Sequence, residues 1–124
     1  MLNNLVPAAW LWLALIHLTP ALALFRPALL THLYGVASGS PLFLLMHHRA
    51  ALFAGVFLAC IWAAADTGPR PLAAVIAAIS MLSFLGLYAA AGQPPALRTI
   101  ALADLAGLPA LAFVLYLAFA GGSR

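Results

Sequence analysis

The stretch PLFLLMHHRAALFAGVFLACIWAAA, residues 41–65, decides the fold. Apart from His47, His48 and Arg49 it is apolar, and it exceeds the roughly 20 residues that a helix needs to cross a lipid bilayer. Ser40 before it is a favourable N-cap, and Pro41 suits the first helical position. We therefore expect a membrane-spanning helix that carries an arginine inside it.

Three further apolar runs occupy residues 5–25, 72–91 and 98–120, separated by short segments rich in glycine and proline. With connections this short, consecutive spans should be antiparallel neighbours. The pattern predicts an all-α integral membrane protein, an antiparallel four-transmembrane-helix bundle that forms one domain over residues 1–124. Between the first two spans, Leu30, Leu33 and Tyr34 fall on one helical face before Gly35, which predicts a short interfacial helix.

The composition supports the membrane class. Hydrophobic residues make up 67% of the 124 residues and charged residues 6%, and the mean hydropathy is +1.14. The chain has no lysine and no glutamate, so its net charge of +3 comes from five arginines and two aspartates. No basic patch exists for a nucleic-acid surface, which excludes that class of partner. Cys60 is the only cysteine and is expected in the core.

Most polar side chains are predicted to lie in one half of the membrane. Spans two and four both begin on the face opposite the termini, and Arg49 lies about two turns into one while Asp104 lies about one and a half turns into the other. The two should be nearly level. The other half holds three aromatic residues where an interfacial belt would lie: Trp10, Trp62 and Tyr116.

Arg49 and Asp104 carry the site hypothesis, because ionisable groups inside a membrane are costly and usually functional. A neighbouring histidine could carry a proton near neutral pH. The candidate catalytic residues are His48, Arg49 and Asp104, and the candidate substrate-binding residues are His17, His32, Tyr34, His47, Ser83, Tyr88 and Arg98. The structural alternative is an interhelical ion pair between Arg49 and Asp104 that locks the bundle.

Two further kinds of chemistry receive less support. His17 and either His47 or His48 could ligate haem from facing helices, but no two histidines have the i, i+4 spacing of a helical metal pair, so no metal site is expected. Ser80 and Ser83 come without a nucleophile motif, and a serine in a membrane helix typically hydrogen-bonds its own backbone or a neighbouring helix.

Three segments together resemble a known family: Leu33 to Val36, Leu45 to Phe53, and Leu97-Arg98 with Ala103-Asp104. They are similar to short four-span bacterial inner-membrane proteins without an assigned activity, whose layout is like that of DoxX-related families. Some members carry the label phosphopantetheine adenylyltransferase, which this chain does not support because it has no strand-loop-helix unit for a nucleotide. The resemblance implies a bacterial inner-membrane location and adds weight to His48, Arg49, Arg98 and Asp104.

Three function classes follow. The first binds or transforms a membrane lipid or another lipophilic small molecule with a polar head. The second is an accessory subunit of a larger membrane complex, or a homo-oligomer, whose interfaces are rows of small residues such as Ala51, Gly55 and Ala59 in the second span. The third is a transporter or proton path, which the one-sided distribution of polar residues argues against. The positive-inside rule sets no orientation, because Arg26 and Arg98 on one side balance Arg70 and Arg124 on the other.

Overall fold

The computed structural model describes residues 2–35, 37 and 39–120, apart from the side chains of residues 2, 3, 33 and 34. Throughout this part of the chain the secondary structure is helical, with no strand. The elements in chain order are α1 (Leu2–Leu22), α2 (Ala28–Tyr34), α3 (Pro41–Ala65), α4 (Arg70–Ala90), the 3₁₀ turn η1 (Pro95–Leu97) and α5 (Arg98–Phe119).

Four of the helices are long and apolar enough to cross a membrane, namely Asn4–Leu22 of α1, α3, α4, and Pro95–Phe119 comprising η1 and α5. This confirms the predicted all-helical class and its four apolar spans. Large apolar side chains point outward along these helices, including Leu44 and Leu87, each 71% exposed. Such a surface would be unfavourable in water and suits contact with lipid.

The helix ends follow the local sequence. The hydroxyl oxygen of Ser40 accepts from the backbone N–H of Leu42 at 3.0 Å, which caps the start of α3. Gly35 ends α2 in the left-handed region with φ of 69°, and its N–H donates to the Thr31 carbonyl at 2.8 Å. At the far end of α3 the guanidinium of Arg70 donates to the carbonyl oxygens of Ala63 and Ala64, at 2.7 and 3.4 Å. These contacts satisfy carbonyls that a helix end leaves unpaired.

The first long helix ends at Leu22, whereas the sequence pattern predicted helix to residue 25. The amides of Ala23, Leu24 and Phe25 instead donate three residues back, at 3.1 to 3.3 Å. Such bonds form a tighter turn than the α-helix. The chain thus begins to change direction before Arg26 and Pro27.

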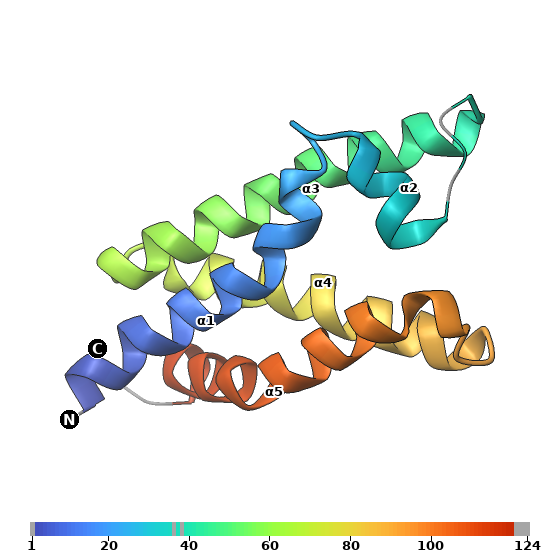
Figure 1. Ribbon diagram of the computed structural model, residues 1–124. Coiled ribbons are helices and arrows are strands. Elements are labelled where there is room, and N and C mark those ends of the chain that lie inside the picture. Colours follow the sequence, from blue (N-terminus) through green and yellow to red (C-terminus); the bar gives the residue numbers. More distant parts are fainter. Residues whose placement is uncertain (1, 36, 38, 121–124) are drawn as a thin grey trace.

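The long helices pack in two pairs (Figure 1). α1 runs along α3 and also contacts α5, while α4 contacts α5 and α3. α1 and α3 separate from α4 and α5 toward the end that carries α2 (Figure 1). At that end α2 contacts both α3 and η1, so it connects the two pairs.

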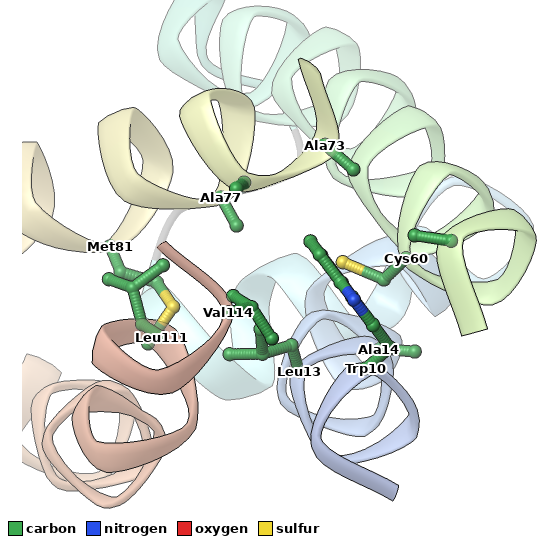
Figure 2. Packing of buried hydrophobic residues seen from close by; sticks show 11 residues of the cluster. Trp10, Leu13, Ala14, Cys60, Ala73, Ala77, Met81, Leu111 and Val114 are labelled. Carbon is green, nitrogen blue, oxygen red and sulfur yellow. The ribbon is translucent and has the colours of Figure 1, made fainter. Parts of the chain in front are cut away.

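Among the residues that the structure describes, most buried apolar side chains belong to two separate clusters. The larger one, which we call the terminal cluster, joins all four long helices and includes Trp10, Cys60, Ala77 and Val114 (Figure 2). The smaller one, the α2 cluster, contains Ala23, Leu30 and Ala50. Two polar residues, His17 and Asp104, are buried outside both clusters. Together with Arg49 they line one pocket, and we call these three residues the polar layer.

Trp10 corrects one prediction. It was expected to anchor the chain at the membrane interface, but only 1% of it is exposed, and its indole lies beside Cys60 inside the terminal cluster (Figure 2). Trp10 shares a helical face with Leu13, Ala14 and His17, all of them buried, and this face packs inward. Trp62 and Tyr116 are each 60% exposed.

Candidate functional site

His17 of α1 is buried, with 2% of its surface exposed. Its Nδ1 lies 2.8 Å from the Leu13 carbonyl oxygen, and its Nε2 lies 3.0 Å from the hydroxyl oxygen of Ser80 on α4. A carbonyl oxygen can only accept, so in the neutral ring Nδ1 carries the proton and Nε2 accepts from the serine hydroxyl. These two contacts fix the tautomer of His17 and hydrogen-bond α1 to α4.

Arg49 of α3 is half-buried, and its guanidinium carbon lies 4.4 Å from the ring centroid of Phe53. The two residues are one turn apart, so the helix itself brings the cation over the ring. The His17 ring lies 5.9 Å from the same phenylalanine, centroid to centroid. Phe53 therefore forms the surface against which both the arginine and the histidine rest.

Asp104 of α5 is buried, with 9% of its surface exposed, and the positive charge of Arg49 acts on its carboxyl group. A buried carboxylate without a compensating charge would be strongly destabilising. The arrangement brings an arginine from α3 and an aspartate from α5 close enough for their charges to interact.

These three residues border one pocket of about 290 Å³ between α1 and α5, here called the α1–α5 pocket. Its polar members come from three different helices, and its other walls are mainly apolar. Exposed residues of α1 and α5 form its rim, so the pocket opens sideways between these helices. The lining residues are Trp12, Leu15, Ile16, His17, Thr19, Pro20, Arg49, Phe53, Phe84, Thr99, Ile100, Ala103, Asp104 and Ala106.

A second pocket of about 350 Å³ lies between α3 and α4, here called the α3–α4 pocket. It shares Arg49, Phe53 and Phe84 with the first, so these residues separate the two spaces. Its remaining lining residues are Leu52, Val56, Ile76, Ile79, Ser80, Ser83 and Leu87. The hydrogen bond from Ser80 to His17 thus connects a residue of one pocket with a residue of the other.

The other predicted site residues lie elsewhere. Ser83 borders the α3–α4 pocket, and its hydroxyl donates to the carbonyl of Ser80 at 3.5 Å. Tyr88 and Arg98 line a separate pocket near the start of α5. His32 lines another beside α2. The side chain of Tyr34 lies outside the described residues.

Neither histidine of the pair before Arg49 lines the α1–α5 pocket. His48 is exposed on α3. His47 is half-buried, and its Nε2 lies 2.9 Å from the Leu24 carbonyl oxygen. The geometry therefore puts His17, rather than His48, beside the arginine and the aspartate.

The haem hypothesis gains no support from these contacts. The Nε2 atoms of His17 and His47 are both engaged in hydrogen bonds, so ligation of an iron by them would require both contacts to break. Within the part of the chain that the structure describes, no three His, Cys, Asp or Glu side chains are placed to hold a metal ion.

Two contacts at the pockets escaped the sequence reasoning. One is the Ser80–His17 hydrogen bond, which joins residues 63 positions apart. The other is the indole N–H of Trp12, which donates to the Ala106 carbonyl at 3.2 Å across the rim of the α1–α5 pocket. No local sequence pattern indicates either contact. A third contact, between Arg49 and Phe53, could have been found from their i, i+4 spacing, which is typical of a cation–π pair on one helix.

No family model, curated protein or solved structure matches this chain. With four candidate membrane-spanning helices, the class that the chain supports is a multi-pass membrane protein. A more specific assignment has to come from the pockets and the residues that line them.

Proposed function

We propose that this protein binds or transforms a lipophilic small molecule with a polar head in the α1–α5 pocket. One observation supports this above all: Arg49, Asp104 and His17 border a pocket whose remaining walls are largely apolar. Ligand sites typically combine apolar walls with a few convergent polar groups. A volume of about 290 Å³ suits a ring or a lipid headgroup with the first part of its chain.

Each polar residue has a role in this proposal. The Arg49 guanidinium attracts an anionic or strongly polar head group. Asp104 offsets the charge of Arg49 when the pocket is empty and accepts hydrogen bonds from a ligand. His17 lines the wall beside them and can exchange a proton. The exposed rim between α1 and α5 lets an apolar chain extend sideways into the bilayer.

We further propose the setting of this site. The four long helices form an antiparallel transmembrane bundle, with α2 lying at one membrane interface above the pocket, in the bacterial inner membrane. This setting is supported by the short connections between spans and by the resemblance to short four-span bacterial proteins. Gly55 is exposed on α3, and a small residue at such a position suits close contact between two copies of the chain.

The experiment is to extract the protein gently with its lipids and identify co-purified small molecules by mass spectrometry. A defined lipophilic molecule should be present in the wild type, and its molar ratio should fall about tenfold or more in Arg49→Ala, equivalent to about 1.4 kcal/mol. Arg26→Ala is the matched control, since it removes an exposed guanidinium that lines none of the pockets above.

Two other results would contradict the proposal. Equal loss of the molecule in both arginine variants would mean that it binds the general surface. A stoichiometric protein partner with no small molecule would make the chain an accessory subunit of a membrane complex, in which Arg49 and Asp104 act structurally.

A further inference from the structure

The hydrogen bond between Ser80 and His17 has a second feature besides joining two helices. Ser80 is half-buried and borders the α3–α4 pocket, while its hydroxyl oxygen lies 3.0 Å from the imidazole Nε2. The Leu13 carbonyl holds the Nδ1 proton of the same ring at 2.8 Å. The accepting nitrogen of an oriented imidazole therefore faces a hydroxyl that a molecule in this pocket can reach.

This arrangement is the one that activates a serine nucleophile. A serine hydroxyl reacts readily only when a base takes its proton, and the base in turn needs a partner that fixes its tautomer. Here His17 is the base and the Leu13 carbonyl fixes the ring. Arg49 borders the same pocket, so a positive charge is available in this pocket to stabilise negative charge that develops on a carbonyl oxygen.

The remaining walls of the α3–α4 pocket indicate the substrate class. Leu52, Ile79 and Leu87 are apolar and exposed, so they continue the pocket outward toward lipid. A pocket of about 350 Å³ with one polar end and an open apolar end matches an acyl chain that ends in an ester carbonyl.

We propose that Ser80 is the nucleophile of an acyl-ester hydrolase site in the α3–α4 pocket, with His17 as its general base. The Ser80 oxygen forms a bond to the ester carbonyl carbon while its proton passes to His17 Nε2. The ester C–O bond then breaks, and His17 returns the proton to the departing alcohol. Water attacks the acyl-serine in the same way and releases the carboxylic acid and the free serine.

This activity goes beyond the proposed ligand site, because the reaction takes place on Ser80 in the α3–α4 pocket, although Arg49 borders both pockets and His17 lines the α1–α5 pocket. The structural alternative is that Ser80 and His17 only hold α1 against α4. The two differ in one measurable property, the chemical reactivity of the Ser80 oxygen, which a purely structural hydrogen bond does not raise.

The test treats the full chain, in detergent micelles, with a long-chain alkyl fluorophosphonate. This probe forms an oxygen–phosphorus bond with an activated serine and releases fluoride. Peptide mass spectrometry should find the adduct on Ser80 and not on Ser83, which borders the same pocket and is more exposed. Ser80→Ala should abolish the adduct, and Ser40→Ala, which removes a serine of a helix cap, should retain it. His17→Gln should slow labelling about 100-fold or more.

A second pair of variants keeps His17 in place in case His17→Gln does not fold. In Ser80→Cys the new thiol lies beside the imidazole, whereas in Ser83→Cys it is more exposed. N-ethylmaleimide should modify Ser80→Cys at least about tenfold faster than Ser83→Cys. Folded protein that shows no fluorophosphonate adduct on Ser80, or faster modification of Ser83→Cys, would overturn the proposal. Neither result would affect a lipid that co-purifies in the α1–α5 pocket.

Discussion

Arg49 holds its guanidinium carbon 4.4 Å from the centre of the Phe53 ring, one helical turn further along α3. Both residues border the α1–α5 pocket and the α3–α4 pocket. The pair therefore forms part of the wall between the two pockets. The contact with Phe53 holds the guanidinium of Arg49 in place and so fixes the position of its positive charge.

Replacing Phe53 should weaken this wall through the loss of the cation–π contact. Phe53→Leu is expected to cost about 0.5–2 kcal/mol of stability, measured by thermal unfolding in a fixed detergent. The same substitution in an Arg49→Met background should cost clearly less, because the cation is already gone. An equal cost in both backgrounds would show that Phe53 contributes only packing.

Arg49 and Asp104 should be energetically coupled. Arg49→Met or Asp104→Asn alone should each lower thermal stability, because each leaves an uncompensated charge in the polar layer, at a cost of up to about 3–5 kcal/mol. The double variant should cost less than the sum of the two, with a coupling on the order of 1 kcal/mol or more. Additive effects would show that the two groups do not interact.

A side chain at Gly107 should force the ends of two neighbouring side chains to move, because α5 packs closely there. A methyl group at this position would lie 2.7 Å from Cε of Met81 and would also overlap the end of Ile16. Gly107→Ala is therefore expected to cost about 1–3 kcal/mol by overpacking. Gly86→Ala in α4 is the matched control: nothing lies within 4 Å of the added methyl, so higher helix propensity should leave stability unchanged or raise it by up to about 1 kcal/mol. The prediction is wrong if thermal unfolding ranks the two variants alike.

Arg70 should stabilise the end of α3 through its two bonds to carbonyl oxygens. Arg70→Ala is expected to cost about 1 kcal/mol, a typical net contribution of such hydrogen bonds at a partly exposed position. Arg70→Lys keeps the charge but not the planar fork, so it should recover only part of the loss. Thermal unfolding checks both variants, and full recovery in Arg70→Lys would show that charge alone matters.

The four long apolar helices were predictable because the length of an apolar run sets the length of a candidate membrane-spanning helix. Residues 41–65 were expected as one helix, and the structure has α3 from Pro41 to Ala65. Glycine and proline located the turns for the same reason that they break helices. The end of α1 was less predictable, because its last turn tightens after Pro20 without a change in hydropathy.

The position of each candidate residue along its helix could be predicted from the sequence, but the direction in which its side chain points could not. Counting turns placed Arg49 and Asp104 at one level, and both border the α1–α5 pocket. Counting gives no rotation of the helix about its axis, and adjacent residues on a helix point about 100° apart. His48 was therefore chosen beside Arg49 although it is exposed, while His17 lies in the pocket wall.

Trp10 and Ser80 also show that the rotation of a helix about its axis could not be predicted from the sequence. Trp10 was assigned by its distance from the helix end, a criterion that ignores which face packs inward. The partnership of Ser80 with His17 depends on how α1 is rotated against α4, and no single-sequence pattern carries that information.

The indole of Trp12 is an intrinsic fluorescence probe of the α1–α5 pocket. It is 43% exposed, borders the α1–α5 pocket, and is held there by its hydrogen bond to the Ala106 carbonyl. Trp10 is shielded in the core and Trp62 lies at the far end of α3, so a molecule entering the pocket meets only one of the three tryptophans. The emission of Trp12 should shift or be quenched as the pocket fills, which gives occupancy a fluorescence readout without any added label.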